Sequence, residues 1–156
     1  MMIDNNLVFD TANAITTTRD STNIIDFSVA RDMGDGELLQ VFVQPSGLTS
    51  TATTTTIQAM FMVSTDNSTY TTAAMSTTIQ IGLLSTGSNI LNIAVPIRRI
   101  EDATIYSAGN DAYPRYCKLN YIVSATLSAG TMTAWIGGGR QTNPSAGYPS
   151  GFTVNN

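Results

Sequence analysis

The chain has 156 residues and a net charge of −4, and only 12% of its residues are charged, against roughly 25% in an average soluble domain. The length suits one domain, and its seven lysine and arginine residues are too few and too scattered for binding nucleic acid through phosphates. No stretch nears the roughly 20 apolar residues that span a bilayer, and no histidine is present as a general base or metal ligand. We therefore expect a chain that is not an enzyme, with no cofactor, metal, nucleic acid or membrane partner.

Short runs of β-branched and apolar residues alternate with turn residues along the whole chain. The 24 threonines and 14 serines favour sheet over helix, because threonine is β-branched, and they replace charge on the wetted surface. In chain order, the expected strands cover residues 7–9, 23–29, 37–44, 55–63, 77–84, 90–95, 115–124 and 131–136. Turn residues stand at 32–36, 45–47, 65–68, 85–88 and 108–111. We predict an all-β single domain, a jelly roll or β-sandwich of about eight strands, with extended terminal arms and little helix.

The seventh expected strand carries the clearest alternation of apolar and polar residues. Cys117, Leu119 and Tyr121 share one face of it. We predict that Tyr116, Leu119 and Tyr121 belong to a structural core strand, with Leu119 and Tyr121 facing the core. Arg115, at the start of the strand, is expected to form an ion pair with an acidic residue.

The two ends of the chain differ in composition from the body. We expect an N-terminal arm at residues 1–6, a β body at 7–139 and an irregular tail at 140–156, which is rich in glycine, proline, serine and asparagine. An apolar arm is a candidate for binding a partner or a neighbouring copy. The predicted contact residues are Met1, Met2, Ile3, Asp4 and Asn5 in the arm, and Tyr148 and Phe152 in the tail.

The segment at residues 49–56 is nearly pure threonine and alanine. One interpretation is a loop that enters a strand with an uncharged outer face. The other is a contact strip against a neighbouring subunit, because ordering threonine costs less side-chain entropy than ordering lysine or glutamate.

Five short motifs contain residues that could carry chemistry, and each has a simpler structural interpretation. Glu101 and Asp102 are sequence neighbours, which would point to opposite faces of a strand. The acidic stretch at 32–37 lacks the ligand spacing of a calcium loop, and the glycines at 137–139 precede no helix pattern that would cradle a phosphate. Cys117 has no base beside it, and the stretch at 67–69, which matches a glycosylation sequon, is expected to be a turn.

Three segments resemble the cement (decoration) proteins of short-tailed phages. They are the opening Met2-Ile3-Asp4-Asn5-Asn6-Leu7, the acidic glycine turn Ala30-Arg31-Asp32-Met33-Gly34-Asp35-Gly36-Glu37 and the strand Pro114-Arg115-Tyr116-Cys117-Lys118-Leu119-Asn120-Tyr121. The last is similar to the Arg-Tyr-Leu-Arg-Leu-Asn-Tyr strand of that family, with Cys117 in place of an aliphatic residue.

The resemblance implies a jelly-roll fold and a structural role without catalysis. The chain would bind the outer surface of a phage capsid and stabilise contacts between capsomers. Its partners would be the major capsid protein of a tailed phage and further copies of itself, a dimer more readily than a trimer. It would be made in the cytoplasm of the bacterial host and end on the outer surface of the virion.

The alternative is a carbohydrate- or receptor-binding β-sandwich module of a phage tail or fibre. Such a module would need exposed aromatic residues, for which Tyr106, Tyr113 and Trp135 are the candidates. The exposure of Trp135 therefore discriminates between the two functions.

Overall fold

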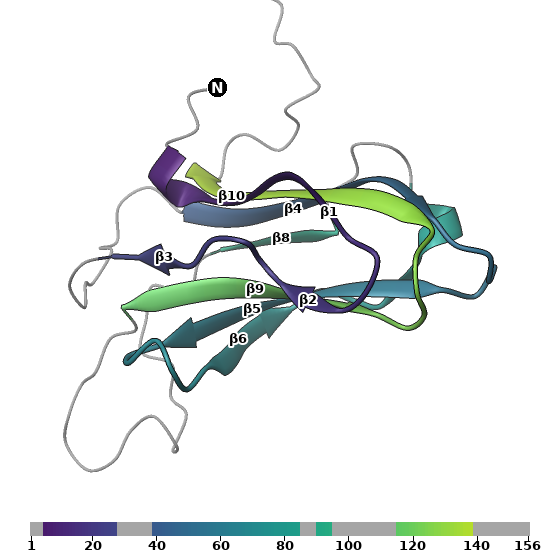
Figure 1. Cartoon of the computed structure of the whole chain (residues 1–156). Coiled ribbons are helices and arrows are strands. Elements are labelled where there is room, and N and C mark those ends of the chain that lie inside the picture. Colours follow the sequence, from purple (N-terminus) through teal and green to yellow (C-terminus); the bar gives the residue numbers. More distant parts are fainter. Residues whose placement is uncertain (1–4, 28–38, 85–89, 95–114, 139–156) are drawn as a thin grey trace, which may run out of the picture.

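The computed structural model describes residues 5–27, 39–84, 90–94 and 115–138 (Figure 1). Within these residues the chain forms strands and two short 3-10 helices, which confirms the all-β prediction. None of the helices described there is long and apolar enough to cross a membrane. The elements in chain order are η1 Asn5–Leu7, β1 Val8–Ala14, β2 Arg19–Asp20, β3 Ile25–Asp26, β4 Leu39–Thr49, β5 Thr56–Ser64, β6 Thr71–Met75, β7 Ile79–Gln80, η2 Ile81–Leu83, β8 Leu91–Ala94, β9 Tyr116–Val123 and β10 Ala129–Gly138.

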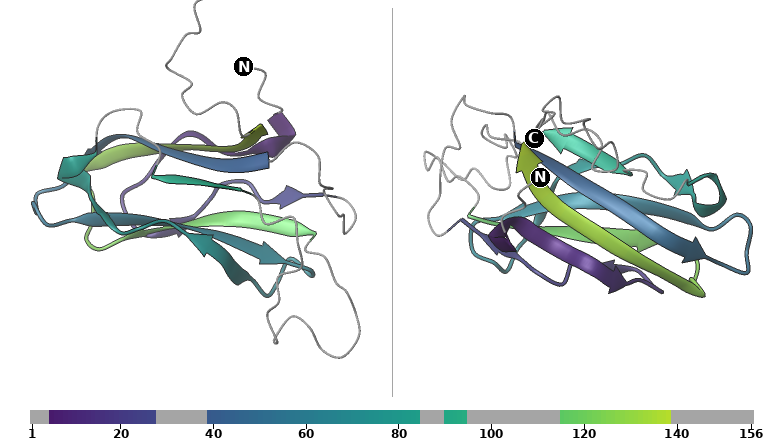
Figure 2. Two further views of the ribbon diagram at one scale, coloured as in Figure 1. Left: turned by 180° about the vertical axis from the view of Figure 1, so that it is seen from behind. Right: turned by 90° about the horizontal axis from the view of Figure 1, so that it is seen from above.

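The strands form two antiparallel sheets that pack face to face (Figures 1 and 2). One sheet has the order β1-β10-β4-β8 and the other the order β2-β9-β5-β6. Strands β2 and β3 both pair with β9, and β6 and β7 both pair with β5, so each couple is one interrupted strand. Counted in this way the described residues form eight strands, and successive described strands lie in different sheets except for β5 and β6. This is a jelly roll, as predicted.

The core lies between the sheets and is built from alternate residues of the long strands. In β5, Ile57, Ala59, Phe61 and Val63 are buried while the residues between them are partly exposed. β9 and β10 contribute in the same way, because successive side chains of a strand point to opposite faces. Burial of these apolar side chains is the main favourable contribution to folding.

The structure corrects one predicted turn and adds two strands. Pro45 and Gly47 were expected to form a turn, but they lie within β4, where Pro45 pairs with Met132 of β10. Among the described strands, β8 pairs with residues 40–43 of β4 and not with Pro45, so the missing N–H of Pro45 removes no hydrogen bond between β4 and β8. Strands β2 and β6 were not predicted.

The connections between strands gather at two ends of the sandwich. One end, which we call the loop end, consists of residues 15–18, 50–55, 81–84 and 124–128. At the other end, which we call the arm end, β1 and β4 begin, β8 ends, β9 begins and β10 ends. The loop of residues 65–70 between β5 and β6 also lies at the arm end.

Candidate interaction surface

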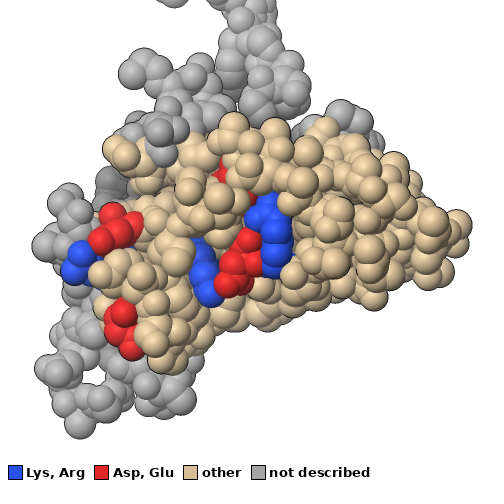
Figure 3. Space-filling model, in the orientation of Figure 1, with Lys and Arg blue, Asp and Glu red and all other residues tan. Residues whose placement is uncertain are grey.

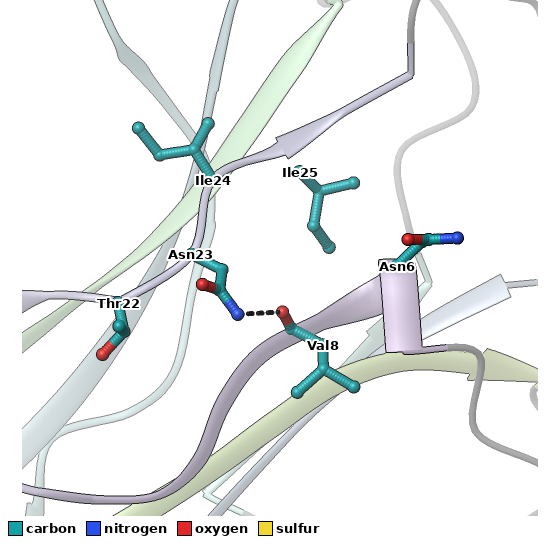
Figure 4. A pocket seen from close by; sticks show the side chains of 6 residues that line it. All are labelled: Asn6, Val8, Thr22, Asn23, Ile24 and Ile25. Carbon is teal, nitrogen blue, oxygen red and sulfur yellow. Dashed lines mark hydrogen bonds between the residues drawn. The ribbon is translucent and has the colours of Figure 1, made fainter.

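A groove opens between the edges of the two sheets, close to the arm end (Figure 4). Its volume is about 370 Å³, and its lining consists of Asn6, Val8, Thr22, Asn23, Ile24 and Ile25. The Asn23 side-chain amide donates to the Val8 carbonyl over 3.1 Å, and the Asn23 backbone N–H donates to the Phe9 carbonyl over 3.0 Å. The groove therefore has a fixed wall and a mainly polar lining, with Val8, Ile24 and Ile25 as its apolar residues and no charged or aromatic residue among the six.

Behind the groove, the buried carboxylate of Asp10 joins the two sheets. Tyr121 of β9 donates its hydroxyl hydrogen bond to Asp10 Oδ2 over 2.7 Å, although Asp10 belongs to β1 of the other sheet. Asp10 Oδ1 accepts from the Asn13 side-chain amide at 2.8 Å and from the Thr22 hydroxyl at 2.7 Å. Burial, and then the negative charge and hydrogen bond of Asp10, raise the pKa of the Tyr121 hydroxyl, which stays protonated as the donor.

Arg19 forms an ion pair with Asp10 and hydrogen-bonds to the backbone on both sides of the turn from β1 to β2. Its guanidinium lies 3.2 Å from Asp10 Oδ1 and also donates to the backbone carbonyls of Ala14 at 3.0 Å and Asp20 at 2.8 Å. It also stacks over the Tyr121 ring at 5.2 Å from the centroid. A buried charge with this many partners is a structural anchor. Its partners occupy the Asp10 carboxylate, which is therefore not free for acid–base chemistry.

Two further ion pairs follow the outer side of the same strands (Figure 3). Lys118 of β9 lies 2.6 Å from Asp20 of β2, and Arg115 donates two hydrogen bonds of 2.7 and 2.8 Å to Asp26 of β3. Asn120 also donates to Asp20, at 2.7 Å. These pairs hold the interrupted strand β2–β3 against β9, which is a structural task.

The pKa values of two exposed carboxyl groups are lowered by their hydrogen bonds. Partial burial raises the pKa of Asp20, but the hydrogen bonds from Lys118 and Asn120 and the charge of Lys118 together outweigh this effect and lower it. Asp66, in the turn between β5 and β6, accepts hydrogen bonds from the backbone N–H groups of Thr69 and Ser68, which lower its pKa.

Within the part of the chain that the structure describes, every basic side chain has an acidic partner. Arg19, Lys118 and Arg115 pair with Asp10, Asp20 and Asp26 respectively. The fourth carboxylate there, Asp66, is held by its own turn. The described surface therefore offers no unpaired cation for a phosphate or an acidic ligand.

A stacked aromatic pair lies on the outer face of the β1-β10-β4-β8 sheet. Phe42 of β4 and Trp135 of β10 are register partners, and their ring centroids are 5.3 Å apart at an interplanar angle of 19°. Their exposed fractions are only 1% and 3%. Trp135 therefore offers no exposed ring for stacking on a sugar, and the carbohydrate-binding alternative loses one of its three candidate residues.

The predicted site residues divide between the described strands and the rest of the chain. Leu119 and Tyr121 are fully buried and face the core, Tyr116 is half-buried, and Arg115 pairs with Asp26. The residues that lie outside the described part are Met1, Met2, Ile3, Asp4, Tyr106, Tyr113, Tyr148 and Phe152, together with the stretches 32–37 and 101–102. Asn5 begins η1.

The remaining candidates for chemistry have structural roles where they are described. Cys117 is buried in β9, and burial raises the pKa of its thiol, so that it stays protonated and unreactive. Asn67 and Ser68 lie in the β5–β6 turn as predicted, and residues 50–55 form a loop that enters β5. Among the described residues, no three histidine, cysteine, aspartate or glutamate side chains gather to hold a metal ion.

The Asp10 cluster is the feature that sequence reasoning missed. Asp10 and Tyr121 are 111 positions apart, and nothing in the local pattern of either strand marks them as partners. Asp10 directly follows the buried Phe9, so a regular strand would turn it to the opposite face; its burial goes with a register shift between Val8 and Asp10 in the pairing of β1 with β10.

Comparison with known proteins gives one family. No curated protein matches the chain. The model of a phage-associated family, Bbp16, matches residues 9–136, from Phe9 in β1 to Ile136 in β10, which is more than four fifths of the chain and spans both sheets. The chain therefore belongs to the Bbp16 family and is a phage-related protein.

Proposed function

We propose that the protein is a cement protein of a phage head, which binds the outer surface of the capsid and stabilises contacts between capsomers. The observation that carries the proposal is that the described charged and aromatic side chains have structural roles. The three described ion pairs hold strands together, and the stacked pair Phe42–Trp135 is buried. What is left is a jelly roll of a phage-related family with a hydroxyl-rich exterior that carries few charges.

The net charge of the chain favours the outside of the shell. At −4, the protein would be repelled by packaged DNA, and its few basic residues could not offset that repulsion. Closed symmetry is the rule for soluble homo-oligomers, so we expect a dimer on the capsid before a trimer.

The predicted arm gives the proposal a specific test. η1 begins at Asn5 and Asn6 lines the groove, so the groove lies where the described fold begins. We expect deletion of Met1–Asn5 to leave the melting temperature of the isolated protein nearly unchanged and to weaken binding to heads at least tenfold, about 1.4 kcal/mol.

The measurement is co-sedimentation of purified protein with heads stripped of their own copy. A matched variant, Ile24→Ser, removes an apolar side chain that is 45% exposed at the rim of the groove. Comparing Ile24→Ser with the deletion distinguishes a contribution of the groove rim to head binding from a contribution of the arm. Absence of saturable binding by the full chain would sink the proposal; full binding by both variants would move the interface away from this region.

A further inference from the structure

We infer that the loop end is a second docking surface, which binds an uncharged protein surface of the phage shell; this inference rests on the proposed function. Residues 15–18, 50–55, 81–84 and 124–128 include no charged and no aromatic residue. On the face seen in Figure 3, this end of the molecule shows no lysine, arginine, aspartate or glutamate, and the charged pairs lie further along the strands. The exposed groups here are hydroxyls and methyls, from residues such as Thr17, Thr53 and Thr126.

The loop end is held in one conformation by hydrogen bonds between its loops. The Leu127 N–H donates to the Thr16 carbonyl at 2.7 Å, and the Ile81 N–H donates to the Thr55 carbonyl at 3.0 Å. The hydroxyls of Ser50 and Thr55 are 2.8 Å apart, and Leu127 itself is buried beneath the surface. Because the backbone is already fixed and threonine has few rotamers, little conformational entropy remains to be lost on binding.

One apolar side chain projects from this surface. Leu83 of η2 is 75% exposed, more than any other large apolar residue among those described; Met75 of β6 follows at 56%. An exposed aliphatic side chain on a rigid, neutral surface is the arrangement of an anchor that fills a hollow on a partner.

The chemistry of the loop end selects the partner. A charged surface docked here would lose its water without gaining a counter-charge, which costs free energy. A sugar would find no ring to stack on. The groups on offer are suited to a neutral protein surface with hydrogen-bonding groups and an apolar hollow.

The position of the loop end agrees with a bridging function. The described ends of the chain at residues 5, 27, 39, 94, 115 and 138 all lie at the arm end, opposite the loop end. β10, with ten residues, connects the two ends over about 33 Å. Contact at both ends would let one molecule touch two neighbouring shell subunits.

The test places charge of either sign on the anchor. We expect Leu83→Asp and Leu83→Lys each to weaken binding to stripped heads at least tenfold in the co-sedimentation assay, because neither charge finds a partner. Met75→Asp is the matched control: it makes the same change at an exposed apolar residue outside the loop end and should bind as the unmodified protein does. Thermal melting of all three variants checks that the fold is intact.

The outcomes separate this inference from the proposed function. If the unmodified chain binds heads and the Leu83 variants bind equally well, the loop end is not an interface, while the proposed function stands. Tighter binding by one Leu83 variant and weaker binding by the other would show a charged partner and overturn the inference. The inference would also be overturned if the Leu83 variants changed the oligomeric mass in light scattering without changing head binding. The partner of the loop end would then be a second copy of the chain.

Discussion

At the scale of single residues, the Asp10 carboxylate couples the two sheets. It accepts hydrogen bonds from Tyr121, Asn13 and Thr22, and it pairs with Arg19. Removing one donor leaves part of a buried charge unsatisfied, which costs more than an ordinary hydrogen bond contributes. The cluster therefore makes the relative position of the sheets specific.

The first prediction concerns the Tyr121 hydroxyl. We expect Tyr121→Phe to lower the free energy of unfolding by about 1–3 kcal/mol, because a buried acceptor loses its donor. Tyr70→Phe removes an exposed hydroxyl that donates to Asn67, and water can replace it, so little loss is expected. Urea unfolding measures both, and equal losses would contradict the role given to Asp10.

The second prediction concerns pH. The pKa of Asp20 is lowered in the folded state, so its contribution to stability is fully present above its unfolded pKa of about 3.9 and is lost as pH falls below that value. The chain has no histidine, the side chain that ordinarily titrates between about pH 8 and 5. The melting temperature should be flat from about pH 8 to 5 and fall only in acid, with a shallower acid decline for Asp20→Asn. A decline that begins between about pH 7 and 5 would contradict this account.

At the scale of elements, substitutions on the inner and the outer face of β9 should differ in how much they lower the free energy of unfolding. Leu119 is fully buried, whereas Ile122 on the outer face is 36% exposed. We expect Leu119→Ala to cost about 2–5 kcal/mol, and Ile122→Ala much less, because only the first leaves a cavity. Denaturant unfolding of the two variants gives the comparison, and similar losses would mean that the faces are assigned wrongly.

The stacked pair of β4 and β10 gives a spectroscopic prediction. Trp135 is the single tryptophan of the chain and is 3% exposed. Its fluorescence should be shifted to the blue of free tryptophan and resist quenching by iodide until the protein unfolds. Emission typical of a solvent-exposed indole would contradict the burial of this pair.

The elements also show what sequence reasoning can and cannot reach. The alternation in β5 and β9 and the abundance of threonine were enough for the fold class, because a half-buried strand has a period of two. β2 has only two residues, Arg19 and Asp20; Arg19 pairs with Asp10 across the sandwich, and Asp20 pairs with Lys118 of β9 in the same sheet. β6, with the sequence Thr-Thr-Ala-Ala-Met, has no alternation to detect.

Tertiary context accounts for the other differences. Pro45 is typical of a turn, yet β4 continues through it, and among the described strands β8 does not pair with it. Gly130 has a φ of +149° and approaches Leu48 so closely that a Cβ would collide with it, a need for glycine that no local pattern expresses. Of the candidate site, the arm and tail residues came from composition, whereas the Asp10 cluster and the groove depend on pairing between distant strands.

At the scale of the whole molecule, pairing of charges within the fold determines how binding should depend on salt. The described cations already have partners, so few counterions would be released on binding. We expect the affinity for stripped heads to change by less than tenfold between about 50 and 500 mM salt. A loss of a hundredfold or more, in co-sedimentation at the two concentrations, would show that charge carries the interface.

The most direct test of the proposed function is a cryo-electron microscopy comparison of phage heads with and without this protein. The account predicts extra density on the outer surface of the shell, into which a two-sheet jelly roll fits, bridging neighbouring shell subunits. Density inside the shell, density confined to the tail, or heads that look the same in both samples would contradict it.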